Sequence, residues 1–431
     1  MQTQLARLFR FEERQTTFRT ELLAGLTTYL TMAYIVFVVP TTLGAAGLDK
    51  PALIAVTCLV TALSSALMGL GANVPIALAP GLGMSAFFTY TLVLANGIAW
   101  PVALGIGFWA GVLFLFLSLI GAREKLVEAI PPTIVTAIPV GIGLFLLFIG
   151  LRNMGLVVAN PATLVGLGKF TRPVVISVVG LFVTLALLIR NVKGAILIGI
   201  VVATALAAGA GLVEAPKQLF TSSIRVAPVT LKLDPLGALK WSLLGPIFAL
   251  FYINLFDSLG TLVACASEAG LRQPDGKIQR LGRMLNIDAI AAILSSLLGS
   301  SPSTAYIESA TGIAAGGRTG LTAVVTALLF VGSLAIIPLI GVVPAYATAP
   351  ALVIVGLLMI SQIRHLDFSQ YEEYVPALFT ILMMPFSFSI ATGMACGFLS
   401  WGIIRLLLLR PQQISGVMYV IMALSLVSLL L

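Results

Sequence analysis

Long hydrophobic stretches, most of them free of charge, alternate along the chain with short polar connections. The stretches lack the strict period-2 alternation of barrel strands, so the pattern predicts membrane-spanning α-helices. A helix needs about 20 apolar residues to cross a bilayer. Segments near that length lie at about 22–43, 52–71, 101–120, 133–150, 174–190, 194–212, 240–264, 284–299, 320–341, 346–361, 374–391 and 393–409.

Two further segments, at about 78–95 and 304–316, are shorter and interrupted by glycine and proline. Including them predicts fourteen spans, seven on each side of the polar, proline-containing stretch 213–236. The interrupted segment is the third span of each half, and because seven is odd, the second half enters the membrane from the opposite side. This arrangement is typical of a transporter built from inverted repeats with a midplane binding site. The alternative is a pair of ordinary kinked helices.

The predicted organisation has five parts. Residues 1–21 form a cytosolic lead-in with an amphipathic pattern and no cleavable signal. Two seven-span repeats at 22–212 and 237–411 flank the linker 213–236. The apolar residues 412–431 are consistent with a further span, a continuation of the last hairpin or a helix on the membrane surface.

Composition supports an integral membrane protein. Of the 431 residues, 59% are hydrophobic and 9% are charged, against about a quarter charged in soluble proteins. The net charge of +8 is assigned to cytoplasmic loops rather than to nucleic-acid binding. With the N-terminus inside, about two thirds of the Lys and Arg residues face the cytoplasm, in agreement with the positive-inside rule. Both termini are then cytoplasmic.

Cysteine and histidine content argues against several site classes. The three cysteines, Cys58, Cys265 and Cys396, all lie in apolar stretches, and His365 is the single histidine. An odd number of dispersed cysteines does not form a disulfide framework. No metal site, cofactor site or histidine-based catalytic triad is expected from these residues.

Two of the 16 acidic residues are placed at membrane depth, Asp257 and Glu308. An ionisable residue in this position is costly and marks a functional site by default. Other acids lie at segment edges, from which they can reach an interface: Glu21, Glu128, Glu268 and Asp288.

The surroundings of Asp257 form a polar stripe, because Asn254, Asp257, Ser258 and Thr261 share one face of a helix. Such a stripe is expected to face a cavity; the alternative is a structural network between helices. Glu308 lies among hydroxyl residues after Pro302, and that proline disfavours a continuous helix.

The two broken segments are expected to place half-helix N-termini opposite each other. Unpaired amides at these ends favour an anion, whereas the two carboxylates oppose one. A neutral planar ligand with both donors and acceptors satisfies both, with Phe87, Phe88 or Tyr306 covering its face. A proton is the expected coupling ion, because a buried carboxyl group readily holds one; backbone carbonyls leave Na⁺ open.

Several ordered motifs resemble the AzgA-like purine permeases of the nucleobase–ascorbate and uracil permease group. They extend over nearly the whole chain: 23–35 (LAGLTTYLTMAYI), 79–83 (APGLG), 255–262 (LFDSLGTL), 305–310 (AYIESA), 314–325 (AAGGRTGLTAVV) and 344–352 (PAYATAPAL). The resemblance implies seven-plus-seven inverted repeats with short antiparallel strands in spans three and ten. It implies a core domain (spans 1–4 and 8–11), a gate domain (spans 5–7 and 12–14), elevator-type movement and a homodimer.

The same resemblance implies a lipid-embedded secondary active transporter of a plasma (bacterial inner) membrane, taking up adenine, guanine or hypoxanthine by proton symport. Asp257 and Glu308 match the family's purine-binding acids and are the candidates for proton coupling. Other expected binding residues are Ser85, Gly83, Phe87, Ser303 and Thr304. Two positions depart from the family pattern. Ser85 stands where an asparagine is usual, and Asn254 where many members have aspartate, so the preferred purine is left open.

Several alternatives compete with a purine transporter. A carrier for another planar base, such as xanthine or uracil, fits the same site. An anion carrier of the same fold is disfavoured by two midplane acids. An intramembrane hydrolase would need an activating motif that the sequence does not show, so no enzyme is expected. A channel is a further alternative.

Overall fold

The computed structural model describes residues 2–121, 129–214, 216, 218–221, 224–273 and 277–430. Glu128 lies outside these ranges, as do three basic residues of the orientation count, Arg123, Lys125 and Lys217, and part of the linker.

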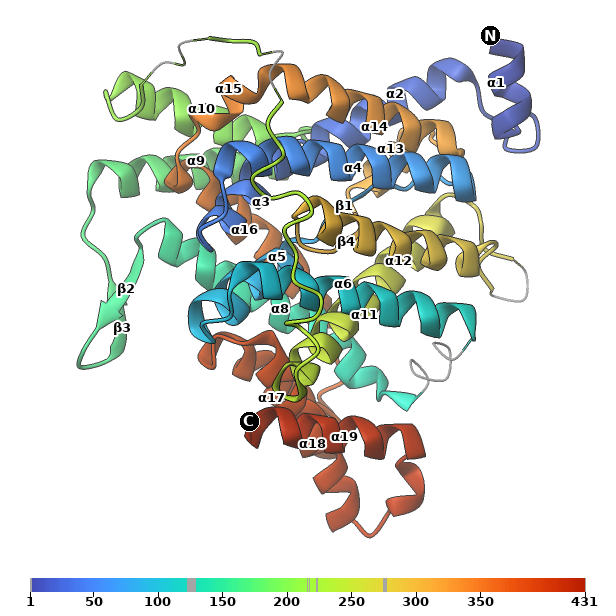
Figure 1. The fold of residues 1–431 in the computed structure, drawn as a ribbon, viewed down its shortest axis with the longest axis vertical. Coiled ribbons are helices and arrows are strands. Elements are labelled where there is room, and N and C mark those ends of the chain that lie inside the picture. The colour runs from blue at the N-terminus through green and yellow to red at the C-terminus, as the bar shows by residue number, and fades with distance from the viewer. Residues whose placement is uncertain are drawn as a thin grey trace.

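Helices dominate the described chain (Figure 1). In the first half they are α1 (Gln2–Phe9), α2 (Phe18–Met32), α3 (Ile35–Gly44), α4 (Lys50–Ala72), α5 (Leu82–Ala86), the π-helix η1 (Phe87–Ala95), α6 (Trp100–Leu119), α8 (Pro132–Asn153), α9 (Arg172–Ile189) and α10 (Ala195–Gly209). In the second half they are α11 (Leu244–Glu268), α12 (Leu281–Leu298), α13 (Ser309–Ala314), α14 (Gly320–Ser333), α15 (Ile337–Gly341), α16 (Ala345–Ile360), α17 (Tyr371–Phe386), α18 (Ile390–Leu407) and α19 (Gly416–Leu430).

Ten helices in the described ranges are long and apolar enough to cross a membrane, so the chain is an integral membrane protein. The predicted spans at 194–212 and 374–391 form the shorter helices α10 and α17, of 15 and 16 residues. The two interrupted segments each combine a strand with a short helix. The count of fourteen spans therefore stays a prediction.

A pair of short strands lies near the middle of the helical assembly (Figure 1). Strand β1 (Leu78–Pro80) pairs antiparallel with β4 (Ser303–Ala305), and Ala79 stands opposite Thr304. Further backbone bonds extend the pairing at both ends, from Gly81 N to the Pro302 carbonyl (3.0 Å) and from Tyr306 N to the Ala77 carbonyl (3.0 Å). Prolines at 80 and 302 disfavour helix here, and the predicted short strands in the two broken segments are confirmed.

Serines of the preceding helices hold both strands in place. Ser65 of α4 donates to the Leu78 carbonyl (3.0 Å) and accepts from the Leu78 amide (3.0 Å). The Ser295 hydroxyl of α12 is hydrogen-bonded to that of Ser303. In a lipid environment, non-helical backbone persists only where the protein itself satisfies its polar groups, and these serines contribute to that.

The helices pack in two groups. Helix α4 packs against α14, and α12 against α6; α2 also contacts α14, and α11 contacts α6. In a second group, α8 packs against α16 and α17, α16 against α9, α9 against α10, and α17 against α18. The C-terminal helix α19 packs against α18 and α11. Contacts within each group are denser than those between the groups.

Glu21 is fully buried rather than at an interface with solvent or lipid. Its carboxylate accepts hydrogen bonds from the amides of Arg318 (2.9 Å) and Thr322 (3.2 Å) and from the Thr322 hydroxyl (2.6 Å). Anions are favoured at helix N-termini, so Glu21 of α2 acts as a cap for α14. At the N-terminus, Phe9 and Phe11 pack against Leu321 of the same helix.

A β-hairpin not expected from the sequence follows α8. Strands β2 (Val157–Asn160) and β3 (Leu164–Leu167) pair antiparallel and project from the helical body (Figure 1). Leu164 is 83% exposed. The sequence did not predict this hairpin because its four-residue strands are too short to show a clear alternating pattern.

Candidate functional site

Asp257 and Glu308 come together beside the β1–β4 crossing. Asp257 lies in α11, and Glu308 occupies the N-cap position of α13. Their carboxyl groups are close enough to interact electrostatically. Both residues are partly exposed, although the strands beside them are buried. The two acids therefore border accessible space within a packed, largely apolar interior.

Tyr34 orients Glu308. This tyrosine lies at the break between α2 and α3, and its hydroxyl donates to Glu308 Oε1 at 2.6 Å. Because one carboxylate oxygen is engaged by Tyr34, the second is left to face a ligand. Sequence reasoning did not assign Tyr34 to the site. Its signal was a polar tip within an apolar first span, which the pattern alone does not distinguish from ordinary packing.

The polar residues along α11 fall into a buried pair and a partly exposed pair. Asn254 and Ser258 are buried, and Ser258 donates to Asn254 Oδ1 (3.2 Å) and shares a hydrogen bond with Thr304 of β4 (2.8 Å). Asp257 and Thr261 are partly exposed. The stripe thus joins α11 to the strand crossing on one side and borders accessible space on the other.

The remaining predicted residues lie in packed surroundings in this conformation. Ser85 is fully buried; its hydroxyl donates to the Gly81 carbonyl (2.8 Å) and pairs with the Ser301 hydroxyl (2.7 Å). Phe87 is also fully buried. Ser85 connects the two broken segments, and neither side chain faces open space beside the acids.

Gly83 marks a close approach between α5 and α8. A Cβ at this position would lie 2.9 Å from Ile142 Cγ2, which is closer than real side chains pack. Ser303 is fully buried and bonded to Ser295, with the Ser64 hydroxyl at 3.4 Å. The structure places both residues in the scaffold that positions the acids.

Asp288 is a third acid that sequence reasoning placed at a segment edge. Helix α12 begins at Leu281, so Asp288 lies two turns inside it and is fully buried. Neither carboxyl oxygen has a hydrogen-bond partner that meets normal geometry, although Ser258 and Asp257 are near. An isolated buried carboxylate is very costly as an anion, so we expect Asp288 to hold a proton in this conformation.

The site offers acceptors, hydroxyls and the short α13. In the described part of the chain, no group of three His, Cys, Asp or Glu residues is arranged to hold a metal ion. The carboxyl groups of Asp257 and Glu308 can accept hydrogen bonds from a ligand and can exchange a proton.

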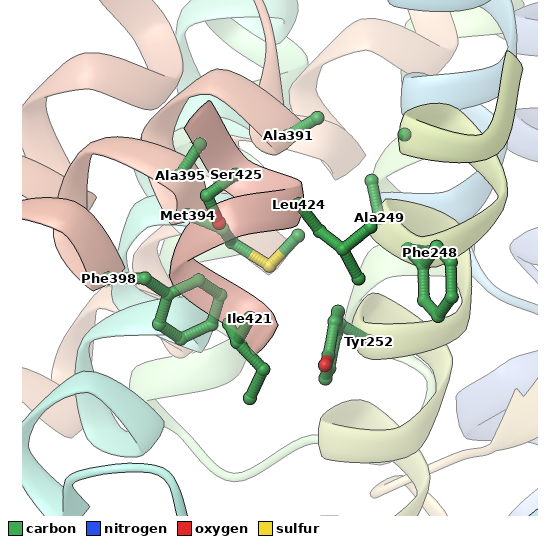
Figure 2. A pocket seen from close by; sticks show the side chains of 11 residues that line it. Phe248, Ala249, Tyr252, Ala391, Met394, Ala395, Phe398, Ile421, Leu424 and Ser425 are labelled. Carbon is green, nitrogen blue, oxygen red and sulfur yellow. The ribbon is translucent and has the colours of Figure 1, made fainter. Parts of the chain in front are cut away.

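A small apolar cavity of about 30 Å³ lies away from these acids, between α11, α18 and α19 (Figure 2). Tyr252 and Phe398 face each other across it, with ring centroids 5.9 Å apart. Its lining carries no charged residue. We interpret it as a gap in helix packing beneath the C-terminal helix.

The chain is similar to bacterial permeases over nearly its whole length. Over 412 residues, 94% of this chain and 91% of the relative, the chain is 43% identical to the adenine permease AdeP of Escherichia coli (strain K12). Over 425 residues, 95% of this chain and 96% of the relative, it is 38% identical to the guanine/hypoxanthine permease PbuG of Bacillus subtilis (strain 168). These relatives are permeases and not enzymes.

The fold is shared with solved anion transporters. The transmembrane domain of the cyanobacterial bicarbonate transporter BicA matches with a TM-score of 0.64 and 16% identity, covering 88% of this chain and 97% of that domain. Residues 19–396 match the family model Xan_ur_permease, described as the Permease family. The resemblance to purine permeases is confirmed, and the chain belongs to this permease family.

Proposed function

We propose that the protein takes up purine nucleobases (adenine, guanine or hypoxanthine) by secondary active transport. The observation that carries this is the pair of partly exposed acids, Asp257 and Glu308, at the strand crossing. The names of the relatives AdeP and PbuG support a purine substrate.

The recognition chemistry follows from the donors and acceptors present. Glu308, with Oε1 engaged by Tyr34, offers its other oxygen to a ring N–H. Asp257 binds the opposite edge of the base or carries a proton. Thr304 bridges to Ser258 beside it. The bond from a ring N–H to the Glu308 carboxylate is charge-assisted, and such a bond is roughly twice as strong as a neutral one.

Two groups of helices support the proposed inverted repeats. If each span is matched with the span seven places along the chain, the α4–α14 contact between the halves corresponds to the α12–α6 contact, and the α2–α14 contact to the α11–α6 contact. The second group, α8–α10 and α16–α18, follows the same correspondence. The first group then forms the core and the second the gate, which move against each other as an elevator. Ser85, Gly83, Phe87 and Ser303 shape the core around the ligand.

Orientation and coupling complete the proposal. With the N- and C-termini cytoplasmic in a plasma membrane, the connections at 96–99, 154–171 and 387–389 lie outside. A proton carried by Asp257 or Glu308 couples the gradient to uptake, and Na⁺ is the alternative ion. The protein works in lipid, as a homodimer.

Uptake into proteoliposomes tests the function. We expect saturable accumulation of labelled adenine, guanine or hypoxanthine driven by an inward proton gradient and abolished by a protonophore. Competition with unlabelled xanthine and uracil ranks other planar bases. Accumulation of bicarbonate without any nucleobase uptake would instead assign an anion carrier of the same fold, and a lack of transport for every nucleobase would refute the proposal.

A further inference from the structure

Phe388 adopts a backbone conformation that bulky residues avoid. It lies in the connection between α17 and α18 with φ +55°. The left-handed region is unfavourable for an aromatic residue, and such strain persists only where surrounding contacts impose it. Pro385 near the end of α17 and the N-cap Ser389 of α18 confine the turn between them.

Aromatic contacts hold the Phe388 ring from two sides. Phe145 and Phe148 of α8 meet it edge-on, with centroids at 5.4 and 5.9 Å. Tyr90 of η1 meets it from the proposed core, at 6.0 Å and 89°. The Arg152 guanidinium lies 5.6 Å from the ring centroid. The ring is thus shared between the proposed gate and the proposed core.

Two hydrogen bonds cross between the same parts. The Thr91 hydroxyl of η1 donates to the Phe388 carbonyl at 3.1 Å, and Asn153 Nδ2 of α8 donates to the Tyr90 hydroxyl at 3.1 Å. Tyr90 and Thr91 are buried and lie one turn beyond Phe87 on the same broken span. Tyr90, Thr91, Asn153 and Phe388 are called the outer latch below.

Accessible space is present toward both proposed faces of the membrane. A cavity of about 480 Å³ is lined by Phe148, Arg152, Phe388 and the β2–β3 hairpin, on the proposed outer face. Phe388 contacts both this cavity and η1. From Asp257, exposure continues along α11 through Gly260 to Ala264, toward the proposed cytoplasmic end.

We propose that the outer latch is the external gate of the transporter: Phe388 closes the path from the outer cavity, and the latch must separate for the site to open outward. The proposal rests on the proposed function for its orientation. The two cross-hydrogen bonds stabilise the closed state, and release of the strained Phe388 backbone favours opening. The structure then corresponds to a state closed to the outside and accessible from the cytoplasm.

Cysteine labelling tests the gate without any substrate. Gly260→Cys is the reporter, because a Cβ at Gly260 meets no atom within 4 Å. It is introduced in a background lacking Cys58, Cys265 and Cys396. A membrane-impermeant maleimide is applied to right-side-out and to inside-out vesicles. We expect fast labelling from the cytoplasmic side and slow labelling from outside.

Weakening the latch should raise labelling from outside. Loss of one hydrogen bond, in Thr91→Val or Tyr90→Phe, should increase the outside rate about five-fold. Phe388→Asn keeps a residue that tolerates the left-handed conformation but removes the ring, and should increase it further. Ser333→Ala is the control, because it removes a 2.8 Å bond to Tyr29 within the proposed core and should leave the rate unchanged.

Two results overturn the proposal: rapid outside labelling in the parent, or latch variants that label from outside no faster than Ser333→Ala. Unchanged labelling from the cytoplasmic side shows that each variant is folded. Since no purine is present, failure of the gate is distinguished from failure of the proposed substrate, which uptake measures separately.

Discussion

The Tyr34 hydroxyl donates a 2.6 Å hydrogen bond to Glu308 Oε1, joining the break of the first span to the start of α13. Tyr34→Phe removes the donor and leaves the ring in place. Hydrogen bonds to charged groups contribute about 1.5–3 kcal/mol, so we expect the apparent KM for purine to rise at least ten-fold. Tyr29→Phe, which breaks the bond to Ser333, is the matched control; equal KM values in both variants would assign Tyr34 to structure alone.

Neutralising either of the two partly exposed acids, Glu308 or Asp257, should impair transport. Glu308→Gln keeps the size of the side chain but replaces one acceptor by a donor. We expect loss of high-affinity binding, measured by competition against a labelled base in detergent. Asp257→Asn should abolish gradient-driven accumulation. If Glu308→Gln transports with unchanged apparent affinity, the assignment of the binding site is wrong.

Glu21 and Asp288 are both fully buried, but neutralisation should destabilise the protein only at Glu21. Glu21 accepts from the amides of α14 and from Thr322, so Glu21→Gln should lower stability by about 2 kcal/mol. Asp288 has no such partners, so Asp288→Asn should change stability by less than about 0.5 kcal/mol. Thermal unfolding in detergent compares the two; a strongly destabilised Asp288→Asn would show that its carboxyl group is ionised and paired.

Close packing at Gly83 links the broken third span to the proposed gate. Gly83→Ala places a methyl group 2.9 Å from Ile142 Cγ2, and overpacking of this kind costs about 1–3 kcal/mol. We expect the maximal uptake rate to fall several-fold with a smaller change in KM. Adding Ile142→Ala removes the clashing methyl group and should restore the rate. Without rescue, the defect arises elsewhere than this contact.

Several features of the fold and site were predictable from the sequence for physical reasons. Asp257 stood out because a carboxyl group in an uncharged span is costly. The two broken segments stood out because prolines at 80 and 302 interrupt otherwise apolar runs. The antiparallel strands there were predicted from the family resemblance, and the structure confirms them.

Other features depend on tertiary contacts that local pattern does not encode. The sequence placed Asp288 at the edge of a span because the apolar run begins after the true start of α12, which is at Leu281. The partnership of Tyr34 with Glu308 joins residues far apart in the chain. The packing of Ser85 against Ser301 requires knowing how the two broken spans cross.

The strand crossing also constrains how the chain is made. Strand β1 finds its backbone partners only in β4, which is synthesised more than 200 residues later. Until then the amides of Ala77 and Gly81, which bond the Ser309 hydroxyl and the Pro302 carbonyl in the finished protein, need water, another segment or an insertase to satisfy them, because lipid offers no partners. A nascent chain that ends in the linker 213–236 is therefore an incomplete membrane protein, whose first repeat stays unfinished until the ribosome has delivered the second.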